Sequence, residues 1–222
     1  MKCLILGDIH GDWFAADKVI HYATNAHKDI THIIQVGDFG YGFPGTNPWE
    51  PKTSLPIHWL RGNHDNIELL NAEEFDWGPN LIYQKDNSLL TIDGYNLLFM
   101  GGATSIDKAY RTPGRSWWPE ETVNMAAVRA AIERPEKIDC VFSHDTCHDF
   151  KYIEHTLPDG VGDRQALQVL HDYLKPKFWF HGHWHDFKMG KKRNTIWACA
   201  PIITDKTYLL WDGTSISVEN IT

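Results

Sequence analysis

The sequence predicts an α/β fold in which parallel strands alternate with amphipathic helices. Two short apolar runs, Cys3–Leu6 and Thr31–Val36, have the length and the flanking glycine of buried strands. Between them, Trp13–Asn25 spaces its apolar residues as an amphipathic helix does. A strand, a helix and a second strand in this order form a βαβ crossover, so both strands end at the same edge of one sheet.

Each of these two strands runs into glycine followed by aspartate. Cys3–Leu6 is followed by Gly-Asp-Ile-His-Gly, which contains Asp8 and His10, and Thr31–Val36 is followed by Gly-Asp-Phe-Gly, which contains Asp38. Because side chains two residues apart on a strand point the same way, Asp8 and His10 leave the strand end together. A carboxylate and an imidazole at this spacing make half of a divalent-metal site.

Three later apolar runs, also predicted as strands, are followed by amide, imidazole or carboxylate side chains. Asn63, His64 and Asp65 follow Ile57–Leu60. His144 follows Ile138–Phe142, and His183 and His185 follow Lys177–Phe180. Asparagine offers a neutral oxygen ligand, and a neighbouring histidine can protonate or hydrogen-bond a bound group. So many ligands suit two metals, with Asp38 as the natural bridge. Nitrogen and oxygen ligands without thiolate favour Mn, Fe, Zn or Ni over Mg or Ca.

The remaining periodic segments are predicted from the same patterns. Helices are expected at Ile67–Phe75, Glu120–Glu133 and Arg164–Leu174. A meander of short strands, with a hairpin turn at Asp93-Gly94, is expected at Leu81–Tyr83, Leu89–Ile92 and Asn96–Met100. Antiparallel strands that close a second sheet, with a tight turn at Asp212-Gly213, are expected at Asn194–Ala200, Thr207–Trp211 and Ser215–Val218.

Loops rich in glycine or proline are the places where recognition residues concentrate. In Tyr41–Pro56 the aromatic residues either pack or wall a pocket: Tyr41, Phe43 and Trp49. Gly101–Glu121 is either a packed surface loop or the lining of a substrate mouth, and its candidate substrate-binding residues are Arg111, Arg115, Trp117 and Trp118. There the arginines would bind phosphate oxygens, and the tryptophans would stack on a base or an aromatic ester. Thr146–Gly162 is a third loop that could hold such determinants.

Composition indicates one globular domain over residues 1–222. A formal net charge of −8 argues against an extended nucleic-acid surface. The four cysteines form no CxxC pair, so they are expected to be reduced and buried. The N-terminus contains no signal-peptide pattern, and no apolar run approaches the length that spans a membrane. A cytoplasmic protein is therefore expected.

Five motifs, in the order GDIHG, GDFG, GNHD, SHD and GHWH, resemble the signature blocks of the calcineurin-like metallophosphoesterases, in particular small bacterial and phage-type members. They extend from Gly7 to His185. The resemblance implies a four-layer αββα sandwich, with two mixed β-sheets flanked by helices and a di-metal site at the carboxyl ends of strands. It implies one metal held by Asp8, His10, Asp38 and His185, and a second held by Asp38, Asn63, His144 and His183.

The same resemblance implies a phosphoester hydrolase that uses a hydroxide bridging the two metals as nucleophile, with manganese as the first candidate metal. His64 would act as acid or oxyanion stabiliser, and Asp65 would orient it. The expected substrates are small or nucleotide-type esters, cleaved by a phosphodiesterase or broad phosphoesterase. A Ser/Thr protein phosphatase is the alternative, but the second motif lacks Asp-Arg-Gly and the third has aspartate where that group has glutamate. A nuclease and a non-catalytic binding scaffold are the remaining alternatives.

Overall fold

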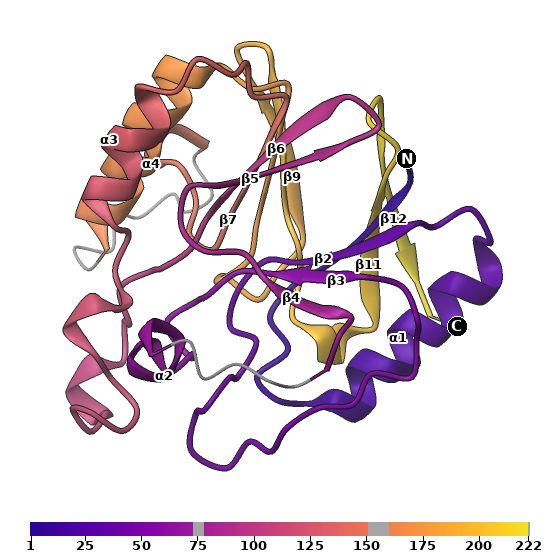
Figure 1. Ribbon diagram of the computed structural model, residues 1–222, viewed down its shortest axis with the longest axis horizontal. Helices are drawn as coiled ribbons and strands as arrows, with labels where there is room; N and C mark the ends of the chain where they lie inside the picture. The colour runs from indigo at the N-terminus through magenta and orange to yellow at the C-terminus, as the bar shows by residue number, and fades with distance from the viewer. Residues whose placement is uncertain (73–77, 151–159, 222) are drawn as a thin grey trace.

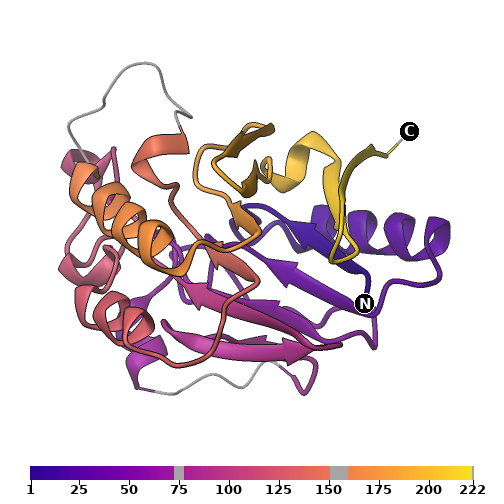
Figure 2. The same ribbon diagram turned by 90° about the horizontal axis from the view of Figure 1, so that it is seen from above.

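The computed structural model describes residues 1–72, 78–150 and 160–221. In this part of the chain, two six-stranded mixed sheets pack face to face, which confirms the predicted α/β sandwich (Figure 1). Helix α1 (Trp13–Ala26) covers the outer face of the first sheet. Helices α3 (Met125–Ile132) and α4 (Val161–Leu174) cover the outer face of the second, as the view from above makes plain (Figure 2). The layers are therefore helix, sheet, sheet and helices.

The first sheet has the strand order β12-β11-β1-β2-β3-β4. Its strands are β1 (Cys3–Leu6), β2 (His32–Gln35), β3 (Ile57–Trp59), β4 (Leu81–Tyr83), β11 (Thr207–Trp211) and β12 (Ile216–Asn220). Strands β1 to β4 run parallel, whereas β11 is antiparallel to β1 and β12 is antiparallel to β11. The predicted crossover from β1 through α1 to β2 is confirmed.

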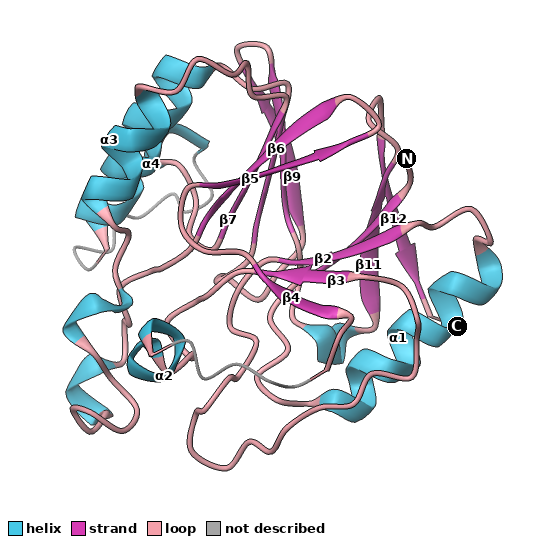
Figure 3. Cartoon of the chain, viewed as in Figure 1, coloured by secondary structure: helices cyan, strands magenta, loops and turns pink. Residues whose placement is uncertain are grey.

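The second sheet has the strand order β5-β6-β7-β8-β10-β9. Its strands are β5 (Ser88–Ile92), β6 (Tyr95–Met100), β7 (Cys140–Ser143), β8 (Phe178–His181), β9 (Lys188–Lys192) and β10 (Thr195–Cys199). The four inner strands are parallel, and the two edge strands are antiparallel to their neighbours. The short helices, visible in Figure 3, are α2 (Ile67–Asn71) and the 3₁₀ turns η1 (Lys108–Tyr110), η2 (Pro119–Glu121), η3 (His148–Phe150) and η4 (Ile203–Asp205).

The side chains of β1 alternate in direction, so this one strand contributes to two hydrophobic cores. Leu4 and Leu6 pack with the buried face of α1, while Cys3 and Ile5 pack between the two sheets. A shift of one residue in register would exchange these two faces, and both are apolar because both are covered. The strand is thereby fixed, and Asp8 follows it at a defined position. Asp12, whose carboxylate accepts the backbone N–H of Ala15 at 3.0 Å, then starts α1.

Three strand predictions were wrong in their sheet assignment. β4 does not form a meander with β5 and β6, because it pairs with β3 in the first sheet. β11 and β12 join the first sheet beside β1, and β10 runs parallel to β8. β9 was missed because its sequence, Lys-Met-Gly-Lys-Lys, lacks apolar alternation. A lysine-rich sequence suits an exposed sheet edge, where charge opposes pairing with another chain.

Helix boundaries agree with prediction to within a few residues, except that α3 begins at Met125 rather than at residue 120. The predicted helix Ile67–Phe75 and the loop Thr146–Gly162 extend in part outside the described residues. All four cysteines are buried and free, as expected. Among the described residues, no helix is long and apolar enough to cross a membrane.

Candidate metal centre

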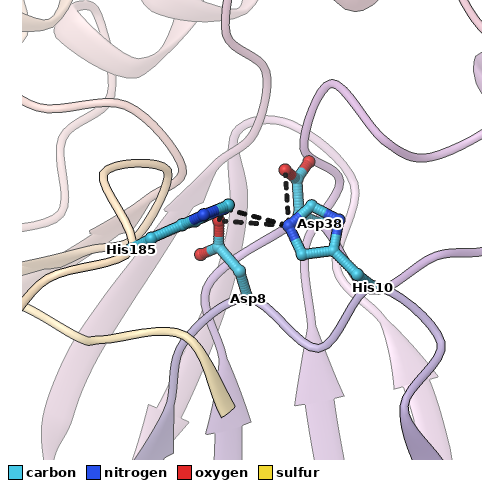
Figure 4. Close-up of side chains that lie close together, drawn as sticks. All are labelled: Asp8, His10, Asp38 and His185. Atoms are coloured by element: carbon cyan, nitrogen blue, oxygen red, sulfur yellow. Dashed lines mark hydrogen bonds and ion pairs between the residues drawn. The ribbon is translucent and has the colours of Figure 1, made fainter. Parts of the chain in front are cut away.

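The predicted ligands follow strands whose carboxyl ends meet at one edge of the sandwich. β1, β2 and β3 are parallel neighbours in the first sheet, and β7 and β8 are parallel neighbours in the second. Figure 4 shows the strands ending below four of the converging side chains, which are Asp8, His10, Asp38 and His185. In parallel sheets, bound molecules and ions generally lie outside the carboxyl ends of the strands, which is this edge.

Asp8, His10, Asp38 and His185 form the first cluster, in which one ligand atom of each residue lies within 4.8 Å of the others. Nε2 of His185 is 3.1 Å from Oδ2 of Asp8 and 3.0 Å from Nε2 of His10. Nε2 of His10 is in turn 3.6 Å from Oδ2 of Asp38. The other oxygen of Asp8 accepts the backbone N–H of His183 at 3.0 Å, which directs Oδ2 into the cluster. Two carboxylates and two imidazoles facing one point are a donor set that a divalent cation fits.

Asp38, His144 and His183 form the second cluster by the same criterion. Nε2 of His144 is 3.1 Å from Oδ1 of Asp38 and 3.2 Å from Oδ1 of Asn63. The amide of Asn63 is oriented by Ser105, whose hydroxyl accepts its N–H at 3.2 Å. The amide oxygen of Asn63 therefore points to the cluster, and all four residues predicted for the second metal meet there.

The surroundings of His144 test whether this cluster fits a metal. Nδ1 of His144 lies 2.9 Å from the carbonyl oxygen of Val36, which can only accept, so Nδ1 carries the proton. Nε2 then faces two further acceptors, the oxygens of Asp38 and Asn63. Three acceptor atoms at this distance need a proton or a cation between them. Metal-binding histidines commonly donate their other N–H to a backbone carbonyl in this way.

The pKa values of His144 and Asp38 also indicate that a cation fits between these side chains. Burial lowers the pKa of His144, but the facing carboxylate of Asp38 outweighs burial and raises it to about 10. Burial raises the pKa of Asp38, while the imidazoles of His144 and His64 lower it by more, so it lies well below its usual value. A proton on His144 thus balances the carboxylate of the free chain. A bound metal would take the place of that proton, because ligating imidazoles are neutral.

Asp38 belongs to both clusters and is placed between them. Its Oδ1 faces His144, and its Oδ2 faces His10. The backbone N–H of His64 donates to Oδ1 at 2.7 Å, which fixes the carboxylate between the two groups of ligands. The predicted bridging position is therefore available to this side chain.

Four of the seven candidate ligands have left-handed backbone conformations. His10, Asp38, His183 and His185 all have positive φ angles, between 50° and 69°, although none is glycine. Residues hold such conformations only where the surrounding structure requires them, and they cluster at functional sites. Two glycines make room for the ligands. A Cβ on Gly62 would collide with Oδ1 of Asp38, and one on Gly182 would collide with Oδ1 of Asp8.

His64 lies beside both clusters and is contacted by Arg111. The Nη2 atom of Arg111 hydrogen-bonds to Nε2 of His64, and Nη1 donates to the backbone carbonyl of Asn63 at 3.0 Å. Asp107 holds the Nε atom of Arg111 at 2.7 Å, and only 6% of the arginine side chain is exposed. Burial lowers the pKa of His64 to about 4, and the charge of Arg111 acts in the same direction.

Asp65 does not contact His64 in the way that was predicted. Its two carboxylate oxygens accept backbone N–H groups from Phe39, Gly40, Tyr41 and Gly62, at 2.7–3.2 Å. Burial raises the pKa of Asp65 to about 6, while these N–H groups lower it. Asp65 thus ties the loop after β2 to the loop after β3, which carries His64, so its predicted role of orienting His64 would be exerted through the backbone.

The residues of the loop Gly101–Glu121 differ in what they contact. Arg111 reaches the metal centre, but Trp118 is buried and therefore serves as packing. Trp117 donates its indole N–H to Glu121 at 3.0 Å and lies under the Lys108 ammonium at 4.0 Å. Arg115 is exposed. Arg111 is thus the residue of this set whose contacts place it at the centre.

Sequence reasoning missed Ser105, whose backbone N–H donates to the buried Glu121 at 2.7 Å. Through Ser105, the loop after β6 helps to orient the ligand Asn63. A signal was present, because Gly101-Gly102 follows a strand parallel to β7 and so lies at the same sheet edge.

A model of the calcineurin-like phosphoesterase family matches residues 1–187. The chain belongs to this family, which is one of phosphoester hydrolases. Among curated proteins, none matches the sequence. Solved structures show the same fold at low identity. The protein TT1561 of Thermus thermophilus has a TM-score of 0.59 and 12% identity, over 99% of this chain and 98% of its own.

Two further structures show how widely the fold is used. GAP50, described as the anchor in the inner membrane complex of Plasmodium, has a TM-score of 0.58 and 13% identity, over 98% of this chain and 83% of its own. A putative 5′-nucleotidase from Staphylococcus aureus has a TM-score of 0.54 and 15% identity, over 99% of this chain and 52% of its own. A fold found in an anchor and in a putative nucleotidase does not define function, so the residues of the site must carry that argument.

Proposed function

We propose that the protein is a two-metal phosphoester hydrolase that acts on small or nucleotide-type esters, as a phosphodiesterase or broad phosphoesterase. The observation that carries this proposal is the position of Asp38, whose two oxygens face two separate groups of nitrogen and oxygen ligands. Asp8, His10 and His185 would complete the first metal site. Asn63, His144 and His183 would complete the second. Manganese is the first candidate for both, with Fe, Zn or Ni also compatible with these ligands.

Two such ions, when bound, would polarise the phosphoryl group and make water nucleophilic at neutral pH. The chain itself would supply the remaining contacts. Arg111 presents a buried guanidinium beside the site, and a guanidinium matches phosphoryl oxygens in charge and geometry. His64 lies next to it and can hydrogen-bond the ester oxygen or transfer a proton to it. Asp65 would keep the two loops that carry Asp38 and His64 at a fixed separation.

Small esters fit the surroundings better than the alternatives do. The cavity beside His10 and His64 has a volume of about 270 Å³, which is below the range of drug-sized ligand sites. The net charge of −8 disfavours a nuclease with a long nucleic-acid track. A scaffold without activity would not need two complete groups of metal-binding side chains at one sheet edge. The four buried, free cysteines suit the reducing cytoplasm.

The test is hydrolysis by the chain after metal removal and reconstitution. The protein is stripped with a chelator, and Mn, Ni, Zn or Mg is added back separately. Turnover of a panel of phosphomonoesters, phosphodiesters, a phosphopeptide and single-stranded DNA is then measured. We expect activity on small esters with transition metals and little with Mg. A protein that binds two metals per chain but hydrolyses no ester would instead be a scaffold, and preference for the phosphopeptide would favour the protein phosphatase.

A further inference from the structure

A cavity opens directly beside the candidate metal centre. It is lined by His10, Gly40, His64 and the segment Phe43–Thr46, referred to here as the Phe43 loop. Because His64 and one member of the first metal cluster, His10, border the cavity, the organic part of an ester bound at the metals could extend into it.

The Phe43 loop is held in one conformation. The hydroxyl of Thr46 donates to the carbonyl oxygens of Gly40 and Phe43, at 2.6 and 2.7 Å. The backbone N–H of Thr46 donates to the same carbonyl of Phe43 at 3.1 Å. The Thr46 side chain also packs on Gly11, where a Cβ would lie 2.5 Å from its Cγ2 atom. The loop is thus fixed to the turn that follows the first metal-binding motif, and the cavity is formed in advance of binding.

Phe43 connects this cavity to the residues beside the metals. Its ring centroid is 4.8 Å from that of His64, and the guanidinium carbon of Arg111 lies 5.8 Å from the same ring. Tyr41 and Trp49, the other aromatic residues of this loop region, are buried in the core under α1. Phe43 is half-buried and lines the cavity, so of the two readings left open for these aromatics it is the one that walls a pocket.

We propose that this cavity binds the leaving group of the ester, and that a single small aromatic or apolar ring is the group that it fits. The assignment rests on the proposed function. Phe43 and Pro44 give the cavity an apolar wall, and the guanidinium of Arg111 lies 5.8 Å from the Phe43 ring without lining the cavity. A ring can stack on Phe43 while His64 reaches its ester oxygen. A volume of about 270 Å³ is ample for one ring, since an apolar cavity of about 150 Å³ already binds benzene.

Phosphonates, which are not hydrolysed, provide the binding test. Dissociation constants of methylphosphonate and phenylphosphonate are measured calorimetrically on the metal-loaded protein. We expect phenylphosphonate to bind about tenfold more tightly than methylphosphonate, because only its ring reaches Phe43. Phe43→Ala should remove most of this difference while leaving the affinity for methylphosphonate unchanged. Phe43→Leu, which keeps an apolar wall, should retain part of it.

Phe14→Ala is the matched control, because Phe14 is an exposed phenylalanine on α1 that does not line the cavity. Hydrolysis of aryl phosphates provides a second readout. Phe43→Ala should raise the KM for phenyl phosphate about tenfold, because the ring loses its apolar wall, and Phe14→Ala should leave this KM unchanged.

The two proposals fail in different ways. If metal-loaded wild-type protein hydrolyses no ester of the whole panel, phosphodiesters included, the proposed function is overturned, and this assignment falls with it. If it hydrolyses esters of that panel but binds neither phosphonate, only the assignment of the cavity is overturned. If the protein hydrolyses esters but Phe43→Ala affects both phosphonates equally, or neither, the cavity does not bind the leaving group. A change of the same size in Phe14→Ala would also overturn the assignment.

Discussion

Arg111 and His64 share a hydrogen bond that joins a loop of the second sheet to a loop of the first. The guanidinium donates to Nε2 of His64 and also, at 3.0 Å, to the backbone carbonyl of Asn63. Asp107 pairs with the same guanidinium at 2.7 Å. Arg111 thus holds the imidazole of His64 and the backbone of a candidate metal ligand in one position. Substitutions of Arg111 and His64 should therefore not act independently.

His64→Ala is expected to keep both metals and to lower turnover by roughly 10²–10⁴-fold, if His64 protonates the leaving group. The loss should be larger for alkyl esters than for nitrophenyl esters, because nitrophenolate leaves without a proton. Metal content is measured by elemental analysis, and kcat is compared across leaving groups. Equal losses for all esters would indicate a positioning or oxyanion role, and loss of metal would contradict the placement of His64 outside the ligand sets.

Arg111→Ala should lower kcat/KM about 10–100-fold, which is the effect of losing one or two charged hydrogen bonds. In the His64→Ala background the same substitution should cost less, because the two side chains act on one group. Arg115→Ala is the control, since Arg115 lies exposed in the same loop. Full additivity of the two substitutions in a double-mutant cycle would show that the contact between Arg111 and His64 has no part in turnover.

Asp38→Asn should nearly abolish activity and remove at least one metal per chain, because it deletes the charge shared by the two clusters. The amide is similar in size to the carboxylate, so the fold should be retained, and circular dichroism would check this. Two metals per chain in an active Asp38→Asn protein would rule out the bridging assignment.

Ser105→Ala tests the orientation of Asn63. The Ser105 hydroxyl accepts the amide N–H of Asn63 at 3.2 Å, so its loss frees the amide to turn its N–H₂ group toward the second cluster. Removal of such an orienting group typically costs about 10–100-fold in metal affinity. We expect one of two metal-binding events in a calorimetric titration to weaken by this factor. Ser217→Ala, at an exposed position of β12, should leave both events unchanged.

The candidate ligand set could be predicted from the sequence because its seven residues follow five strand ends closely. A short apolar run indicates where each strand ends. Because the strands pair in parallel, Asp8, Asp38 and His144 lie at the same edge of the sandwich. The roles of Trp117 and Trp118 could not be predicted in the same way. Which of two neighbouring side chains is buried depends on the packing of the folded loop, in which Trp118 is enclosed while Trp117 hydrogen-bonds Glu121 at its edge.

The sheet assignment of the late strands also depended on distant contacts. The apolar sequence of β11 indicates that another strand pairs with it but does not specify which one. In the structure, β11 pairs with β1, and this buries Leu209 and Trp211 between the sheets. The same limit applies to Asp65. The family resemblance implied that Asp65 orients His64, but it did not indicate that the Asp65 carboxylate accepts backbone N–H groups of the loop after β2.

His58 gives a prediction on stability that does not involve the metal ligands. Burial lowers its pKa to about 4, and the charge of His32 acts in the same direction. Gln84 lies 3.0 Å from its Nδ1 atom and can donate its amide N–H only to the neutral ring. The unfolded chain takes up a proton near pH 6.5, whereas the folded chain resists it until about pH 4. The contribution of neutral His58 is therefore complete above pH 6.5 and is lost as the pH falls from 6.5 toward 4.

His58→Gln should remove this pH dependence, because glutamine can still hydrogen-bond Gln84 but does not titrate. The free energy of unfolding is measured by urea titration in the presence of a chelator, at several pH values between about 7.5 and 4.5, which span the range in which the unfolded chain is protonated first. The wild type should lose more stability over this range than His58→Gln does, and the difference should approach a limit on the order of 3 kcal/mol only below about pH 4. His21→Gln, at an exposed histidine of α1, should follow the wild type. If His58→Gln also follows the wild type, acid destabilisation arises from other groups, and the buried ring of His58 does not resist protonation.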